Sequence, residues 1–341
     1  MKSKVFVFIF VYLVIFPLLL AVRGFGADVD KELNFFRGKV VTVIVTTKPG
    51  GGYDAYGRMM ARFLQKHLPG STVIVKNVAG AGHIIGANDL YFSKPNGLTI
   101  GVGNFKGLIF TQLAKQEGVK FDLTKFSWLA NVASEPQTLI VDKRTPFKTV
   151  KDLQNSSRPI RMGTSGVGSS SYNYTLMIGK ALGINFKVIP GFYGSEADLA
   201  MLRGELDGQI GAYDNLRPLV ENEGARVVLI VGKKKMSQFP DVPLISAFST
   251  PKTKGLIDLM IATAELGRPI AAPPNMPPLR LKALREAIRK TFHDPELLAY
   301  SEKAKLPVSF MSGEETARLF VNALNQSPEI VKMVKELTKI D

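Results

Sequence analysis

The chain has 341 residues, a formal net charge of +15 and no cysteine. The lack of cysteine excludes disulfides, thiolate metal sites, a cysteine nucleophile and a lipidated cysteine after a signal peptide. The excess of basic residues is compatible with binding to anionic small ligands, anionic membrane surfaces or nucleic acid. Net charge alone does not distinguish these partners.

The first 26 residues have the pattern of a secretory signal peptide. Lys2 and Lys4 precede an apolar run over residues 5–22, and small residues up to Gly26 permit cleavage after it. A transmembrane anchor is the alternative, because about 18 apolar residues could nearly span a bilayer. Pro17 inside the run and the short basic flank favour cleavage. We therefore expect an exported protein whose first 26 residues are removed.

The residues after this segment alternate between β-rich and helical patterns. The predicted strand and helix pairs are 40–46 with 55–68, 73–76 with 83–92, and 98–102 with 107–116. Apolar residues recur at helical spacing in the longer segments and form short β-branched runs in the others. This order is typical of βαβ units and predicts a mostly parallel sheet.

A second series of the same kind follows a strand at 128–132. It predicts strands at 138–141, 160–162, 186–189, 208–212 and 226–231, and helices at 151–155, 172–182 and 195–203. The mature chain of about 315 residues exceeds one usual hydrophobic core, so the two series predict two α/β lobes.

The last 80 or so residues change in composition and lack a sheet of their own. A strand-like run at 259–263 and a proline-rich stretch at 268–274 precede predicted helices at 278–292, 294–305, 313–324 and 328–338. We expect these helices to pack on the first lobe. The predicted division is therefore a signal peptide at 1–26, a discontinuous lobe 1 at 27–132 plus 259–341, and lobe 2 at 133–258.

Two glycine-rich turns each connect a predicted strand to a predicted helix. The first is Pro49-Gly50-Gly51-Gly52-Tyr53-Asp54, and the second runs from Gly163 to Ser171. Such a turn gathers unpaired backbone N–H groups and the positive end of a helix dipole, which suits a carboxylate or phosphate. A single turn of this kind is equally compatible with a tight turn that binds nothing. Together, at the carboxyl ends of two sheets, the turns would face each other across an anion-binding cleft.

Motifs for enzymatic chemistry are incomplete. A P-loop needs Gly-Lys-Ser/Thr after its glycines, where this chain has Tyr53-Asp54. The segment Gly163-Thr164-Ser165-Gly166-Val167 lacks the final glycine of a nucleophile elbow. An exported hydrolase with Ser165 or Ser169 as nucleophile stays open, and it requires His83 within about 3 Å of that serine as the base.

Several blocks in order resemble the substrate-binding proteins of tripartite tricarboxylate transporters, the Bug family. The blocks are 49–54 with Arg58, 75–82, 94–99, 163–171, 204–208, Asp214-Asn215 and 239–243. The resemblance covers nearly the whole mature chain. It implies the α/β periplasmic-binding-protein fold with a ligand cleft between two lobes, each a mostly parallel sheet flanked by helices.

The resemblance also implies the function. The chain would be a monomeric periplasmic receptor, not an enzyme, that captures an organic carboxylate and delivers it to the membrane permease subunits of such a transporter. No cofactor, metal or nucleic acid is expected. The alternative is a receptor that serves a signalling kinase instead of a permease.

Site residues follow from the resemblance by position. The expected ligand contacts are Gly51, Gly52, Tyr53, Asp54, Ala81, Gly82 and Asn104 in lobe 1, and Ser165, Gly166, Val167, Gly168, Ser169, Ser170, Tyr193 and Asp214 in lobe 2. The family commonly has Thr in place of Tyr53 and Gly in place of His83, and the segment 190–194 is longer here. These departures predict a larger or aromatic carboxylate. Asp54 and Asp214 are expected to cap helices, and for Asp214 a ligand hydroxyl or ammonium is the alternative partner.

Overall fold

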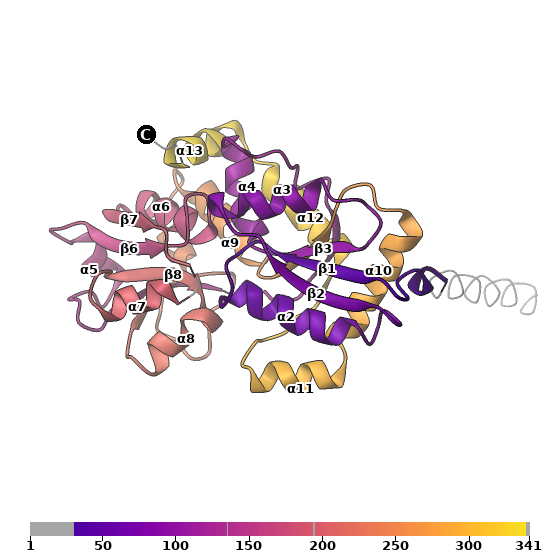
Figure 1. Cartoon of the computed structure of the whole chain (residues 1–341). Helices are drawn as coiled ribbons and strands as arrows, with labels where there is room; N and C mark the ends of the chain where they lie inside the picture. The colour runs from indigo at the N-terminus through magenta and orange to yellow at the C-terminus, as the bar shows by residue number, and fades with distance from the viewer. Residues whose placement is uncertain (1–30, 135, 194, 339–341) are drawn as a thin grey trace, which may run out of the picture.

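The computed structural model describes residues 31–134, 136–193 and 195–338, so the predicted signal peptide lies outside the described residues. These residues form two β-sheets, each flanked by helices (Figure 1). Within the described ranges no helix combines the length and apolarity needed to cross a membrane. The predicted α/β fold with two lobes is confirmed.

The first sheet has the strand order β11-β4-β10-β3-β1-β2. Its strands are β1 (Val40–Val45), β2 (Thr72–Asn77), β3 (Thr99–Val102), β4 (Ser127–Asn131), β10 (Pro269–Ala272) and β11 (Met311–Ser312). Strand β1 pairs in parallel with β2 and β3, whereas β10 and β11 run antiparallel to β4. Side chains alternate across the pleat, so Val41, Val43 and Val45 enter one core and Ile44 enters another.

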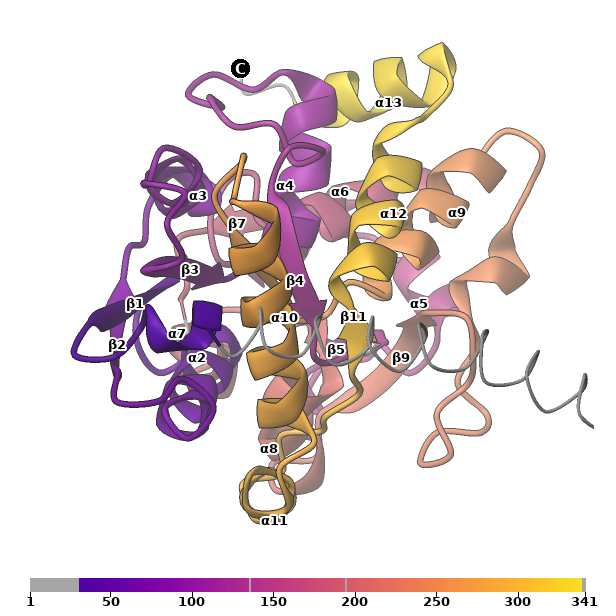
Figure 2. The same ribbon diagram turned by 90° about the vertical axis from the view of Figure 1, so that its right-hand side faces the viewer.

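Helices cover both faces of this sheet, as the two views show (Figures 1 and 2). On one face lie α2 (Gly52–Leu64) and α10 (Pro278–Phe292), with α11 (Pro295–Lys303) against α2. The other face carries η1 (Ala81–His83), α3 (Ile84–Tyr91), α4 (Phe105–Ala114) and α12 (Gly313–Leu324). Trp128 of β4 stacks on Phe320 of α12, with ring centroids 3.8 Å apart.

The second sheet has the strand order β7-β6-β8-β5-β9. Its strands are β5 (Gln137–Val141), β6 (Ile160–Thr164), β7 (Phe186–Pro190), β8 (Gly208–Ala212) and β9 (Arg226–Val231). Strands β6, β7 and β8 pair in parallel, and β5 runs antiparallel to β8 and β9. Helices of this lobe are α5 (Val150–Gln154), α6 (Ser170–Leu182), α7 (Glu196–Leu202) and α8 (Tyr213–Glu221).

The remaining helices lie where the two lobes meet. They are η2 (Ile245–Phe248), α9 (Lys254–Ala264) and α13 (Pro328–Thr338). Helix α13 packs on α4 of the first lobe and on α6 of the second, and α9 packs on α6 and α12. One hydrophobic core therefore continues between the lobes on this side of the molecule.

The chain passes between the sheets after β4 and before β10, and these two segments hydrogen-bond to each other. The amide of Val132 donates to the carbonyl of Arg268, and the amide of Arg268 donates to the carbonyl of Ala133, both at 3.1 Å. The predicted strand at 259–263 is wrong, because those residues belong to α9. The division of the chain at residues 132 and 258 stays a prediction, and α9 runs through its second boundary.

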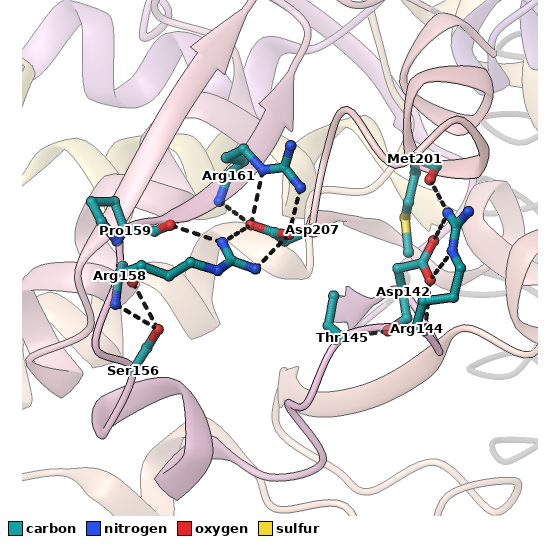
Figure 3. Close-up of polar contacts among 9 residues, drawn as sticks. All are labelled: Asp142, Arg144, Thr145, Ser156, Arg158, Pro159, Arg161, Met201 and Asp207. Atoms are coloured by element: carbon teal, nitrogen blue, oxygen red, sulfur yellow. Dashed lines mark hydrogen bonds and ion pairs between the residues drawn. The ribbon is translucent and has the colours of Figure 1, made fainter.

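An ionic cluster ties β6 to the loop before β8 in the second lobe (Figure 3). The carboxylate of Asp207 is 2% exposed and accepts hydrogen bonds from Arg158 and from the guanidinium and backbone amide of Arg161. Burial opposes ionisation, but these bonds hold the pKa of Asp207 well below its usual range. Asp142 forms a similar pair with Arg144 nearby.

Candidate functional site

A cavity of about 340 Å³ lies between the two lobes. Both glycine-rich turns contribute to its wall, which includes Gly50–Tyr53 from the first and Gly163–Ser165 with Ser170 and Ser171 from the second. The structure therefore brings the two turns together as the sequence predicted. The volume is in the range of pockets that hold small organic ligands.

Helix N-termini surround this cavity. Among the described residues, the first turns of α2, α4, α6 and α8 all contribute to the wall, through Gly52, Lys106, Ser170 and Asn215. The N-cap residue of α2, Gly51, offers no side-chain cap, so amides of that turn are available to a ligand. Because each N-terminus carries partial positive charge, the arrangement favours an anionic group.

Glycines permit the close approach of the two lobes. A Cβ atom on Gly82 would lie 1.9 Å from the carbonyl oxygen of Val167, and one on Gly52 would lie 2.2 Å from Oδ1 of Asn215. Both glycines belong to the first lobe and both contacted residues to the second. The structure is thus a closed arrangement that larger side chains at these two positions would obstruct.

The first glycine turn directs its two polar side chains differently. Tyr53 lies in the cavity wall, where its hydroxyl donates to Oδ1 of Asn104 at 3.3 Å. Asp54 is not in the wall. Its carboxylate accepts from the backbone amide of Gly50 at 3.0 Å and from Arg58 at 2.9 Å. Burial opposes ionisation, yet these bonds lower the pKa of Asp54. The amide belongs to Gly50, which precedes the N-cap Gly51, so the prediction that Asp54 caps an amide of its own helix is wrong.

The second glycine turn presents Ser165 and Ser170 to the cavity. Other residues predicted there lie behind the wall, namely Gly166, Val167, Gly168 and Ser169, as do Ala81 and Gly82 in the first lobe. The Ser169 hydroxyl is buried and caps α6 by accepting from the amide of Tyr172. Tyr193 and Asn104 line the cavity as predicted. Whether any of these residues contacts a ligand stays a prediction.

Asp214 also lies behind the wall, in the first turn of α8. Its carboxylate forms an ion pair with Arg268 at 2.8 Å, and both side chains are at most 2% exposed. The Arg268 guanidinium is part of the wall and lies 4.8 Å from the ring centroids of Tyr53 and Tyr56. This contact connects the segment before β10 to a helix of the second lobe.

The sequence-based prediction missed three basic residues of the wall, Lys48, Lys106 and Arg268. That prediction relies on helix termini and backbone amides alone. Lys106 is 1% exposed in a helix with no other charged residue, and that isolated charge is a signal in the sequence. No local sequence pattern predicts that Arg268 lies in the wall, because its partner Asp214 is 54 positions away in the sequence.

His83 is in the wall and is only 2% exposed. Its Nδ1 lies 2.9 Å from the carbonyl oxygen of Thr46, and its Nε2 has no hydrogen-bond partner. Burial lowers the pKa of His83 to about 4, although the Thr46 contact opposes this shift. Because Nε2 bonds to no serine, the alternative of a hydrolase with Ser165 or Ser169 lacks the base it requires.

Buried polar atoms without partners concentrate around the cavity. In the described part of the chain, Oγ1 of Thr47, Nε2 of His83 and Oγ1 of Thr164 are such atoms, and all three residues belong to the wall. An unpaired buried polar group costs about 1–3 kcal/mol, so proteins rarely keep several in one place without a use for them. A bound ligand or ordered water can supply the missing partners.

Two α/β lobes with a cavity between them, walled by glycine turns and helix N-termini, define the class of bilobed solute-binding proteins. Residues 57–335 match the family described as the tripartite tricarboxylate transporter family receptor, TctC. This match covers most of the chain, so the chain belongs to that receptor family. It is therefore a binding protein and not an enzyme, and the predicted family is confirmed.

Individual relatives agree with this assignment. Protein BugT of Bordetella pertussis is 23% identical over 248 residues, which make up 70% of this chain and 74% of BugT. The solved structure of the periplasmic binding protein BugD has a TM-score of 0.73 at 20% identity and covers 89% of this chain and 98% of BugD. MatC of Rhodopseudomonas palustris with bound malate has a TM-score of 0.70 at 19% identity, covering 89% of this chain and 100% of MatC. These structures share the fold of this chain.

Proposed function

We propose that the protein is a periplasmic receptor that closes its two lobes around an organic carboxylate and delivers it to the permease of a tripartite tricarboxylate transporter. The observation that carries the proposal is the cavity between the lobes, walled by both glycine turns and by helix N-termini, in a member of this receptor family. A carboxylate matches those donors in charge and in hydrogen-bonding capacity.

Other observations agree with each part of this function. The first 26 residues resemble an export signal, which fits a periplasmic location. MatC, which shares the fold, holds malate, a small dicarboxylate. The close approach of Gly82 to Val167 fits a receptor whose lobes meet when the ligand is enclosed.

A thermal-shift screen of the mature protein tests the carboxylate. The panel contains mono-, di- and tricarboxylates, with uncharged alcohols and diamines of matched length as controls. Ligand at 100 times its dissociation constant adds about 2.7 kcal/mol to the free energy of unfolding, which a melting curve resolves. Stabilisation by carboxylates alone supports the proposal. A panel in which no carboxylate stabilises the protein would contradict it.

Ligand size and the partner need separate experiments. A competition series of matched aliphatic and aromatic acids tests the larger ligand that Tyr53, His83 and Tyr193 suggest, and preference for the small aliphatic member removes that idea. Uptake of the bound acid in cells with and without the permease genes tests delivery. Unchanged uptake in cells without the permease, together with a kinase response to the acid, would favour a sensory receptor instead.

A further inference from the structure

His83 has a hydrogen-bonding pattern that restricts what a ligand can present to it. We propose that Nε2 of His83 accepts a hydrogen bond from a hydroxyl group of the ligand, so that the receptor prefers a hydroxy-carboxylate to the same acid without the hydroxyl. This inference rests on the proposed function, because it assigns the chemistry of the carboxylate bound in the same cavity.

The tautomer of His83 follows from its contact with Thr46. The Nδ1 atom lies 2.9 Å from the carbonyl oxygen of Thr46, which can only accept a hydrogen bond. Nδ1 therefore carries the proton. In the neutral imidazole the other nitrogen, Nε2, then has a lone pair and acts as an acceptor.

The ring is neutral at the pH of the periplasm, because burial lowers the pKa of His83 to about 4. A carboxylate oxygen also only accepts hydrogen bonds, so it is a poor partner for Nε2 in this state. Nε2 is buried and has no partner within the protein. A ligand atom that reaches Nε2 therefore has to carry a hydrogen in order to bond to it.

A neutral donor fits the surroundings of the ring better than a cation does. His83 is the N-cap residue of α3, and the side-chain Oγ1 of Thr46 accepts from the amide of Asn104, the N-cap of α4, at 3.3 Å. Two helix N-termini thus lie close to the imidazole. Their partial positive charge disfavours an ammonium group at this point and leaves a hydroxyl as the matching donor.

The experiment uses three four-carbon diacids that differ at one carbon: succinate with hydrogen, malate with hydroxyl and aspartate with ammonium. Propionate, lactate and alanine form a smaller trio, and phenylacetate, mandelate and phenylglycine an aromatic one. Titration calorimetry of the wild-type protein at pH 7 measures each dissociation constant. In the trio that binds tightest, we expect the hydroxy acid to bind about tenfold or more tightly than the other two members.

Variants at His83 distinguish the effect of losing the Nε2 acceptor from a general effect on folding. His83 has a φ of +82°, a left-handed conformation that Asn and Gly tolerate. In His83→Asn the side-chain amide can still donate to Thr46, but no acceptor reaches the position of Nε2. We expect this variant to melt as the wild type does and to bind hydroxy and deoxy acids within about twofold of each other. His83→Gly, which removes the ring without backbone strain, should lose the preference as well.

The outcomes distinguish this inference from the function on which it rests. Equal binding of the hydroxy acid and its deoxy counterpart in the tightest-binding trio would overturn the hydroxyl assignment and leave the carboxylate receptor intact. Tightest binding of the amino acid in every trio would overturn it too, as would a preference that survives in His83→Asn. Absence of binding for all nine acids, with none found in the broader carboxylate panel, would overturn the proposed function and this inference together.

Discussion

Buried polar atoms are hydrogen-bonded within the protein in the ionic cluster of Asp207, but several in the wall of the cavity are not. Both carboxylate oxygens of Asp207 are held by Arg158 and Arg161, at distances between 2.7 and 3.2 Å. In the cavity wall, by contrast, buried atoms of Thr47, His83 and Thr164 have no partner. In the first region the protein itself supplies every partner of the carboxylate, whereas in the second it leaves these three atoms without one.

We expect this difference to distinguish residues that stabilise the fold from residues that bind the ligand. Substitutions in the Asp207 cluster should change the free energy of unfolding and leave ligand affinity alone. Substitutions in the wall should change ligand affinity and, at neutral pH, have little effect on the free energy of unfolding. Four predictions test that separation.

Breaking the ionic cluster should have the largest effect. Asp207→Asn removes a buried carboxylate that two guanidiniums hold, so we expect it to lower the free energy of unfolding by about 3 kcal/mol in urea titrations. Ligand affinity should stay within about twofold of wild type, because binding a ligand in the cavity does not use this cluster. The control is Glu205→Gln, whose solvent-exposed pair with Arg203 should contribute much less to the free energy of unfolding. A large loss of affinity in Asp207→Asn would contradict the separation.

Acid pH should destabilise the folded protein through the buried imidazole of His83. The pKa of His83 falls from the usual 6.5 to about 4 in the folded protein, so the unfolded chain binds more protons between these values. Stability from this group is full above pH 6.5 and is lost as the pH falls to 4. The wild type loses free energy of unfolding between pH 6.5 and 4, and we expect this loss to be about 2–3 kcal/mol smaller in His83→Asn. Identical pH profiles for the two proteins would show that His83 is not buried as described.

Closure should depend on Gly82. In Gly82→Ala the new methyl would meet the Val167 carbonyl, so we expect about tenfold or more weakening of ligand affinity and a more open shape in X-ray scattering. Gly38→Ala is the matched control, because Gly38 has a similar φ of +69° and nothing within 4 Å of a new Cβ. Both variants should lose about 1 kcal/mol of stability from backbone strain. Equal affinity in both would mean that ligand binding does not need this contact.

The smallest predicted effect concerns the unpaired hydroxyl of Thr164. Thr164→Val keeps the shape and removes a buried group without a partner, so stability should stay the same or rise by up to about 1 kcal/mol. Thr316→Val should instead lose about 1 kcal/mol, because the Thr316 hydroxyl donates to the Ser312 carbonyl at 2.7 Å. Thermal melts compare the two variants. Calorimetry should show weaker ligand binding only in Thr164→Val, and stability losses of equal size would argue against an empty hydrogen-bonding position at Thr164.

Most of the fold could be predicted from local sequence patterns. The strand at 208–212 and the helices at 278–292 and 313–324 have the predicted bounds. The error at 259–263 arose because a short apolar run fits a buried helix as well as a strand. The sequence predicts a helix next to Asp214 but not the bounds of α8, since that helix begins directly after β8 and contains Pro218, which is a poor helix residue.

The site was only partly predictable, for a physical reason. Glycine turns are local features, so the wall positions of Gly51, Gly52 and Ser165 could be anticipated. Arg268 enters the wall through an ion pair with Asp214 and ring contacts with Tyr53, which depend on the closed arrangement of both lobes. A single sequence carries no local pattern for such long-range contacts.

The most direct test of the receptor assignment is a crystal structure of the protein with the tightest-binding acid from the carboxylate panel. We expect the acid between the turn at 49–54 and the turn at 163–171, with its carboxylate at helix N-termini. Ligand atoms or ordered waters held by the ligand should lie within hydrogen-bonding distance of Nε2 of His83 and Oγ1 of Thr164. An acid bound elsewhere, or in the cavity with both atoms still unpaired, would contradict the view that the wall is completed by its ligand.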